Sequence, residues 1–139
     1  EGELYSFFQD VLSSGSSDFF HPHPFTFEEA KNICQYDGLD IYYIVVNSQK
    51  VVAYGMLRGW DEGYTVPSLG IVVHSRYRGI GIGKGFMHFL HMASRARGAT
   101  KIRLKVYPSN LEALSLYTSL GYKFELREAE QLVGVLKLS

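Results

Sequence analysis

Glycine stands at every second position from Gly79 to Gly85, after a basic turn and before a run with helical spacing. The residues just upstream, 71–73, are apolar and β-branched, which predicts a strand. Glycines let backbone N–H groups approach a ligand that a Cβ would push away, and the start of a helix adds partial positive charge. The segment therefore predicts a strand, a tight loop and a helix that together hold a phosphate group.

Hydrophobic periodicity over the rest of the chain predicts alternating helices and strands. Helices are expected at about 3–12, 27–36, 80–96 and 110–120, and strands at about 41–46, 51–57, 64–73, 101–107, 122–127 and 131–138. Short turns between neighbouring strands predict hairpins, whereas the helix at 80–96 predicts a crossover. The expected fold class is α/β with a mixed sheet, and 139 residues suit a single domain over 1–139.

The chain has one cysteine, Cys34, which excludes an internal disulfide framework and favours a reducing, cytoplasmic setting. Because Cys34 falls in a helical pattern, we expect a buried structural thiol. No apolar run approaches about 18 residues, so no membrane-spanning helix is expected. Two histidine pairs, His21 with His23 and His88 with His91, lack further ligands at a recognised spacing, so no metal is expected and the second pair should lie on a helix flank.

The formal net charge is zero, but the charges are segregated along the chain. Residues 1–62 carry a net charge of −7, residues 63–111 carry eight basic and no acidic side chains, and residues 112–139 carry −1. A segment without a carboxylate favours a polyanionic ligand nearby, although some of its bases should simply lie on solvated faces. The bases are not arranged in a nucleic-acid-binding motif, so no nucleic acid partner is expected.

Two nucleotide-binding motifs do not fit the glycine loop. A P-loop needs Ser or Thr after Gly-Lys, whereas Gly85 follows Lys84 here. A dinucleotide fingerprint needs a third glycine where Lys84 or Phe86 stands. The remaining pattern is Arg-x-x-Gly-x-Gly, which occurs twice, as Arg76-Gly79-Gly81 and as Arg78-Gly81-Gly83.

This pattern resembles the acetyl-CoA pyrophosphate loop of the GNAT N-acetyltransferase superfamily. A second block, with Asn110, Ala113, Tyr117 and Gly121, resembles the late helix and strand of that family. The resemblance covers about 64–127. It implies the GNAT fold, a mostly antiparallel sheet with a central splayed parallel strand pair flanked by helices. It also implies an acetyl-CoA-dependent N-acetyltransferase in which an amine attacks the acetyl group directly in a ternary complex.

The resemblance also implies roles for individual residues. Backbone groups at the end of the strand before the loop would bind the pantetheine arm and the oxyanion, loop amides would hold the pyrophosphate, and Tyr117 would be the acid that protonates the departing thiolate. Asn110 would hydrogen-bond the cofactor, and Ala113 would leave room beside its arm. The expected cofactor-binding residues are Ile71, Val72, Val73, Arg76, Arg78, Gly79, Ile80, Gly81, Ile82, Gly83, Lys84, Asn110, Ala113 and Tyr117.

The general base and the acceptor are less determined by the sequence. Many family members place Glu or His in or near the strand before the loop, but residues 66–73 contain no carboxylate. Glu62 or Asp61 could act through water, and His21 or His23 could reach the acceptor if their segment crosses the splay. The expected substrate-binding residues are His21, His23, Trp60, Asp61 and Glu62, and Glu62 is the second expected catalytic residue. Aromatic and histidine residues favour a small-molecule amine, for example an amino sugar.

Two other functions stay open at this point. The missing strand carboxylate also fits a GNAT-like module that binds an acyl-CoA and regulates without turnover, whereas Asn110 and Tyr117 favour an enzyme. Nucleic-acid binding through residues 63–111 is the third reading. The final strands of this family often pair across dimers, so a homodimer is a further expectation.

Overall fold

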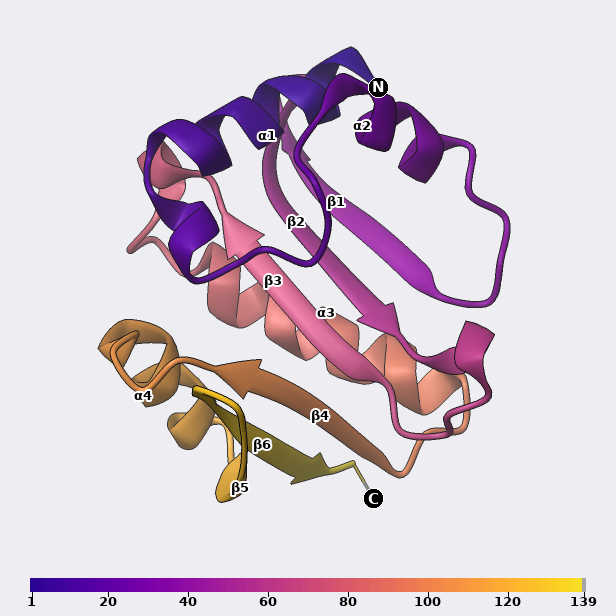
Figure 1. Ribbon diagram of the computed structural model, residues 1–139, viewed down its shortest axis with the longest axis vertical. Coiled ribbons are helices and arrows are strands. Elements are labelled where there is room, and N and C mark those ends of the chain that lie inside the picture. Colours follow the sequence, from indigo (N-terminus) through magenta and orange to yellow (C-terminus); the bar gives the residue numbers. More distant parts are fainter. Residues whose placement is uncertain (139) are drawn as a thin grey trace.

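The computed structural model describes residues 1–138 and contains a six-stranded sheet in the order β1-β2-β3-β4-β6-β5 (Figure 1). The strands are β1 Ile41–Asn47, β2 Lys50–Arg58, β3 Ser68–Val73, β4 Lys101–Val106, β5 Lys123–Glu128 and β6 Gln131–Lys137. The α-helices are α1 Gly2–Ser13, α2 Phe27–Cys34, α3 Ile82–Ala96 and α4 Leu111–Ser119, and three 3₁₀ turns are Ser16–Asp18, Trp60–Glu62 and Ser75–Tyr77. Neighbouring strands are antiparallel except β3 and β4, which confirms the predicted mixed sheet.

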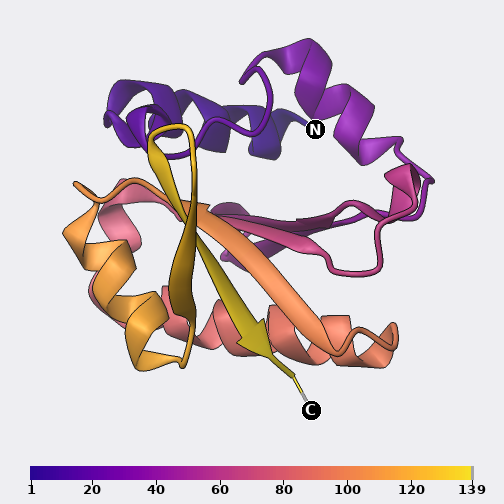
Figure 2. The same cartoon turned by 60° about the horizontal axis from the view of Figure 1, so that its bottom comes forward.

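The parallel pair in the centre of the sheet is open along most of its length. Within the described residues, β3 and β4 have one paired position, Ser68 opposite Arg103, where the Arg103 amide donates to the Pro67 carbonyl at 3.0 Å. Beyond this point the two strands diverge toward their carboxyl ends, and α4 lies at the wide end (Figures 1 and 2). We call the space between the diverging strands β3 and β4, from the Ser68–Arg103 pair to their carboxyl ends, the seam. The expected splay is therefore present.

The two faces of the sheet are covered differently. Helices α1 and α2 lie on one face, over β1–β3, while α3 and α4 lie on the other (Figure 2). The core under α1 and α2 contains Phe7, Phe8, Tyr54 and Met56 among its buried residues. The core under α3 and α4 is larger and continues across β4, with buried side chains including Leu57, Leu90, Ile102, Leu104, Val106 and Tyr117.

Strand β4 shows the strict alternation that its sequence predicts. Ile102, Leu104 and Val106 are buried in the core under α3 and α4. Residues 101, 103, 105 and 107 therefore face the other side of the sheet, where α1 and α2 do not extend. We call this uncovered side of β4 the open face.

The third strand was expected to begin at 64, and this was wrong, because β3 begins at Ser68. Gly63 has a left-handed backbone with φ of 87°, which turns the chain before the strand. Pro67 has no N–H to donate to a ladder. Tyr64 is consequently in an exposed loop rather than in the sheet.

Two expectations about helix packing were also wrong. The buried stripe of α3 runs through Met87, His91 and Ser94, while Phe89 is 40% exposed and packs edge-on against Tyr43. His91 is thus in the core rather than on a helix flank. Cys34 is exposed, not buried, because it is the last residue of α2, a helix that buries Ala30 alone. No helix among residues 1–138 is both long enough and apolar enough to span a membrane.

Candidate active site

The glycine loop joins the end of β3 to the start of α3. Gly79 and Gly81 have φ of 78° and 91°, the left-handed region that side chains with a Cβ rarely adopt. A Cβ on either residue would meet no protein atom within 4 Å, so open space lies in front of both. Gly81 caps α3 without a side-chain hydrogen bond, which leaves the first amides of the helix without partners among residues 1–138.

Gly83 brings the start of α3 close to the end of β3, since a Cβ there would lie 3.6 Å from the Val73 side chain. The loop therefore opens at the wide end of the seam. Arg76 and Lys84 are exposed on it, and no acidic residue occurs between 63 and 111. Free helix amides, open glycines and basic side chains together fit a diphosphate group.

The backbone of β3 presents hydrogen-bonding groups to the seam. The His74 amide donates to the Val52 carbonyl of β2 at 2.8 Å, whereas the Pro67 carbonyl accepts from β4. Because backbone groups alternate in direction along a strand, Ile71 and Val73 turn their N–H and C=O groups away from β2 and toward the seam. An extended ligand with its own amides could pair with this edge.

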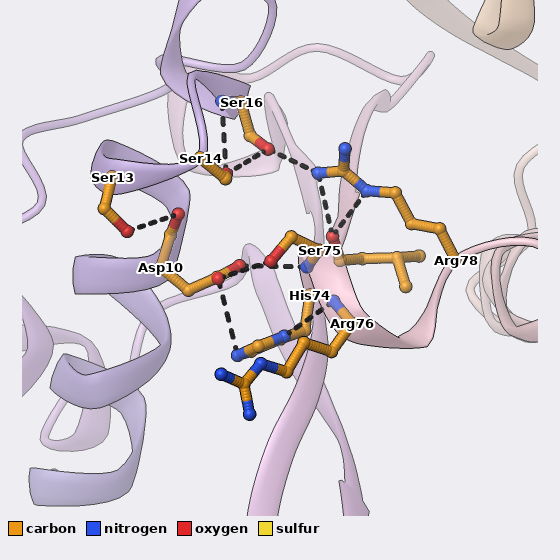
Figure 3. Close-up of polar contacts among 9 residues, drawn as sticks. Asp10, Ser13, Ser14, Ser16, His74, Ser75, Arg76 and Arg78 are labelled. Atoms are coloured by element: carbon orange, nitrogen blue, oxygen red, sulfur yellow. Dashed lines mark hydrogen bonds and ion pairs between the residues drawn. The ribbon is translucent and has the colours of Figure 1, made fainter.

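The loop is held to α1 by a polar network (Figure 3). The Asp10 carboxylate accepts from the Ser75 amide at 2.9 Å and from the Ser75 hydroxyl at 2.6 Å, and it lies 3.6 Å from His74 Nε2. Burial alone would raise the pKa of Asp10, but the Ser75 hydrogen bonds and the nearby His74 and Arg78 outweigh it and lower the pKa. The other ring nitrogen of His74 accepts from the Arg76 amide at 3.1 Å. This network fixes the path of the chain into the loop.

Arg78 points back toward β3 rather than out of the loop (Figure 3). Its Nε and one terminal nitrogen each donate to the Val73 carbonyl at 3.2 Å, and the same terminal nitrogen donates to the Ser16 hydroxyl. Arg78 therefore satisfies the Val73 carbonyl at the wide end of the seam and ties the 3₁₀ turn at Ser16–Asp18 to the loop. Nothing in the local sequence around Asp10 or Ser16 indicated these contacts.

Helix α4 places Tyr117 in the core under the open end of the seam. The Tyr117 side chain is 8% exposed, its hydroxyl has no hydrogen-bond partner among residues 1–138, and burial raises its pKa to about 12. The phenol therefore stays protonated at neutral pH. Asn110 is the N-cap of α4, with its side-chain oxygen accepting from the Ala113 amide at 3.4 Å.

A buried histidine supports the ring beside Tyr117. The Tyr122 ring lies 5.9 Å from the Tyr117 ring, and the Tyr122 hydroxyl is 2.8 Å from His91 Nε2 on α3. Burial lowers the pKa of His91 to about 4, so this histidine is neutral at pH 7. The hydrogen bond joins α3 to the end of α4.

Residues 19–24, which we call the strap, cross over β3 on the side of α1 and α2 (Figure 1). His21 Nε2 is 2.8 Å from the Tyr107 hydroxyl, directly after β4, while His23 Nε2 is 2.8 Å from the Tyr54 hydroxyl on β2. Burial lowers the pKa of His23. The strap thus bridges the two sides of the seam. Among residues 1–138, no three His, Cys, Asp or Glu side chains are grouped so that they could hold a metal ion.

The model of the acetyltransferase (GNAT) family matches residues 7–122 of this chain. The chain belongs to the GNAT acetyltransferase family. Solved structures agree with this in fold. The GNAT domain of S. lividans PAT has a TM-score of 0.81 at 12% identity, with 98% of this chain and 84% of that chain covered.

Two further solved structures with this fold are N-acetyltransferases. The ribosomal-protein-S18-alanine N-acetyltransferase of Escherichia coli has a TM-score of 0.72 at 18% identity and covers 99% of this chain and 87% of its own. The PaiA N-acetyltransferase of Thermoplasma acidophilum, solved with coenzyme A, has a TM-score of 0.77 at 13% identity and covers 98% and 91%. At these sequence identities, the structural likeness shows that this chain shares their fold and shows nothing more.

Trp60, Asp61 and Glu62 lie at the opposite end of β3 from the glycine loop. They follow β2 and precede β3, whose five residue steps span about 17 Å. Trp60 packs against the Arg97 guanidinium, 4.9 Å from its ring centroid, near the end of α3. Asp61 accepts from the Tyr36 hydroxyl and from a backbone amide, and these bonds lower its pKa. The GNAT fold here does not bring this turn to the glycine loop.

Several residues that the sequence did not single out lie at the site of this GNAT chain. They owe their places to contacts between distant segments, and they are Asp10, Ser16, Ser75 and Tyr107. For Tyr107 the alternation of residues 101–107 was a usable signal, because it places this residue on the side opposite the core.

Proposed function

We propose that this chain is an acetyl-CoA-dependent N-acetyltransferase that acetylates a primary amine of a small molecule by direct attack in a ternary complex. The observation that carries the proposal is the seam. It combines an uncapped helix start at Gly81, an open strand edge at Ile71 and Val73, and a buried phenol at Tyr117. A diphosphate would fit the helix start at Gly81, and an arm with amide groups would fit the strand edge at Ile71 and Val73. The Tyr117 phenol would be the proton donor.

The residues of the seam fit coenzyme A. Backbone amides between 78 and 84 would hold the diphosphate, and the edge of β3 at Ile71 would pair with the pantetheine amides. Asn110 and Ala113 would border the arm at the start of α4. Bound acetyl-CoA supplies an acyl group activated as a thioester. Two structurally similar proteins also support this cofactor. The one from T. acidophilum was solved with coenzyme A, and one from Salmonella typhimurium was solved with acetyl-CoA.

Two groups of this chain would stabilise charge during transfer. An N–H at the end of β3 would donate to the oxyanion, and the alternation of the strand favours Val73 over Val72, whose groups face β2. The Tyr117 hydroxyl would give its proton to the departing thiolate. Its pKa of about 12 ensures that the proton is present when it is needed.

The acceptor must lose a proton to become a nucleophile. An alkylammonium with a pKa of about 10 is roughly one part in a thousand neutral at pH 7, which costs about 4 kcal/mol without assistance. Glu62 is poorly placed to take this proton, because its turn lies at the opposite end of β3 from Val73 and the glycine loop. His21 is the alternative, because it lies on the strap beside Tyr107 at the wide part of the seam. An amine of low pKa, such as that of an amino sugar, would need less help from either group.

The test is release of the CoA thiol from acetyl-CoA across a panel of small primary amines, with Tyr117→Phe as the comparison. An enzyme should turn over at least one amine, and Tyr117→Phe should slow that turnover while retaining coenzyme A. A chain that binds coenzyme A but turns over no amine would instead be the regulatory module that the carboxylate-free β3 permits.

A further inference from the structure

The strap crosses β3 where the free edge of that strand begins. A Cβ added to Gly70 would lie 3.3 Å from a ring carbon of Phe20, so the strap rests on the backbone of β3 at this residue. Ile71, the next residue, turns its N–H and C=O groups toward the seam. On the other side of the seam, Tyr107 follows the last residue of β4. His21, which comes directly after Phe20, therefore lies over the seam between β3 and the end of β4 (Figure 1).

His21 and Tyr107 form a hydrogen-bonded pair across the seam. His21 Nε2 is 2.8 Å from the Tyr107 hydroxyl, and within residues 1–138 neither side chain makes another hydrogen bond. Arg58 of β2 donates to the Pro22 carbonyl at 3.2 Å, which holds the strap beside His21 in place. The His21 side chain is exposed and that of Tyr107 is half-buried. An amine arriving from solvent can therefore reach this pair, which the rest of the protein leaves free to act on a ligand.

The pair lies on the opposite side of the sheet from Tyr117. Tyr117 is buried in the core under α3 and α4, whereas the strap lies on the side of α1 and α2 (Figure 1). An acyl group held at the free edge of β3 would have the Tyr117 phenol on one side and the pair on the other. Because the core closes the Tyr117 side, the amine would approach from the side of the strap. The fold thus separates a group that can donate a proton from groups that can accept one.

Two carboxylates that lie near the seam are already paired with other groups. Asp10 accepts hydrogen bonds from both the amide and the hydroxyl of Ser75. Glu128 is 2.7 Å from a terminal nitrogen of Arg103, and the hydrogen bond and charge of this guanidinium lower the pKa of Glu128. A carboxylate held in this way is a weak base, whereas a neutral imidazole commonly takes up a proton near neutral pH. His21 is therefore the better candidate for the base.

We propose that Tyr107 and His21 form a proton relay that deprotonates the acceptor ammonium, with His21 as the general base. The inference rests on the proposed acetyltransferase function. The ammonium donates to the Tyr107 oxygen, and its proton moves to that oxygen while the Tyr107 hydroxyl proton moves to His21 Nε2. The amine keeps the electron pair of the broken N–H bond and becomes a nucleophile. Tyr107 ends the step unchanged, and His21 ends it as an imidazolium that returns its proton to water.

The test compares two amines of similar size, ethylamine and 2,2,2-trifluoroethylamine. Ethylamine is almost fully protonated at pH 7, as alkylamines are, whereas fluorine withdraws electrons and leaves the second amine neutral. Initial rates of thiol release from acetyl-CoA give kcat/KM for the wild-type protein, His21→Gln and Tyr107→Phe. With ethylamine both variants should lose about 100-fold or more, because a general base contributes this much. With trifluoroethylamine the loss should be smaller by about tenfold or more, because that amine has no proton to give up before it attacks.

His88→Gln is the matched control, since it removes an exposed histidine on α3. It should keep the wild-type rates with both amines. If the pair only held the strap in place, His21→Gln would slow both amines by the same factor. Such an equal loss, or no loss, would overturn the relay and leave the acetyltransferase proposal intact. Absence of coenzyme A binding in the wild-type protein would count against that proposal instead.

A second readout does not depend on turnover. The relay requires the Tyr107 hydroxyl to donate to His21 Nε2, so the neutral imidazole must carry its own proton on Nδ1. NMR of the isotope-labelled imidazole nitrogens, in protein saturated with coenzyme A at mildly alkaline pH, distinguishes the two tautomers. We expect the Nδ1–H form in the wild-type protein and a shift toward the Nε2–H form in Tyr107→Phe. If neither amine reacts, this measurement decides, and a wild-type His21 with its proton on Nε2 would overturn the relay.

Discussion

The two halves of the sheet differ in what covers them. Strands β1–β3 lie between α1 and α2 on one side and α3 on the other, and residues 51–57 of β2 are all buried (Figure 2). Strand β4 is buried on alternate residues, and β5 has almost no buried side chains. The amino-terminal half is therefore a packed scaffold, while the carboxyl-terminal half keeps one polar side uncovered.

The seam lies at the boundary and draws on both halves. From the packed half it takes the backbone edge of β3 and the glycine loop, which Asp10 and Arg78 hold in place. The open half contributes the buried Tyr117 phenol. We propose that the packed half positions the cofactor and that the open half supplies the proton donor for acyl transfer.

The strongest test of this division is Tyr117→Phe. If the open half supplies the proton donor, kcat should fall about 100-fold or more, because general acids contribute this much, while the dissociation constant of acetyl-CoA stays within twofold. Tyr64→Phe, in an exposed loop, is the matched control and should keep the wild-type kcat. A Tyr117→Phe enzyme with unchanged kcat would assign the acid to another group.

Stability should depend mainly on the packed half. Leu57→Ala in β2 should lower the free energy of unfolding by about 3 kcal/mol, because a fully buried leucine is replaced by a cavity. Leu126→Ala in β5, where the side chain is 64% exposed, should cost less than about 0.5 kcal/mol. Urea unfolding measures both, and equal losses would contradict the contrast.

The glycine loop can be tested apart from its backbone strain. In Gly81→Ala a Cβ would enter the open space in front of the loop, so we expect acetyl-CoA to bind about 10- to 100-fold more weakly. Gly98→Ala is the control, since Gly98 has a similar φ of 87° and equally open surroundings but lies at the other end of α3. Both variants should lose similar stability. Equal weakening of acetyl-CoA binding would assign the effect to strain alone.

The smallest expected effect concerns pH and the joint between α3 and α4. The pKa of His91 is lowered from 6.5 to about 4 by burial, so its contribution to stability is present above pH 6.5 and is lost as the pH falls toward 4. Between pH 6.5 and 5 the loss should be on the order of 1 kcal/mol once solvent screening is allowed for.

Urea unfolding at these two pH values measures that loss. His91→Asn should abolish this part of the pH dependence, whereas the exposed His88→Asn should retain it. If both variants follow the wild-type pH dependence, the His91 side chain is not the group that titrates.

Features that depend only on residues close together in the sequence could be predicted from it. The glycine loop, the alternation of β4 and the order of elements all follow from local patterns. The early start expected for β3 was wrong because residues 64–67 are not part of a paired strand, and pairing begins at Ser68. His91 was misplaced because its partner, Tyr122, is 31 residues away.

The site divides in the same way, into residues set by local sequence patterns and residues set by contacts between distant segments. The loop and Tyr117 could be named from spacing, whereas the anchors of the loop could not, since Asp10 and Ser16 reach it from 65 and 62 residues away. Trp60, an expected substrate-binding residue, has the Arg97 guanidinium over one face of its ring, a contact between segments 37 residues apart.

The most direct test of the account is a titration of isotope-labelled protein with coenzyme A, followed through its backbone amide resonances. We predict saturable binding with the largest shifts at Ile71, Val73 and residues 79–84, where free amides face the seam and the start of α3. Absence of saturable binding, or shifts confined to another surface such as the turn at Trp60–Glu62, would contradict the assignment of the seam as the cofactor site.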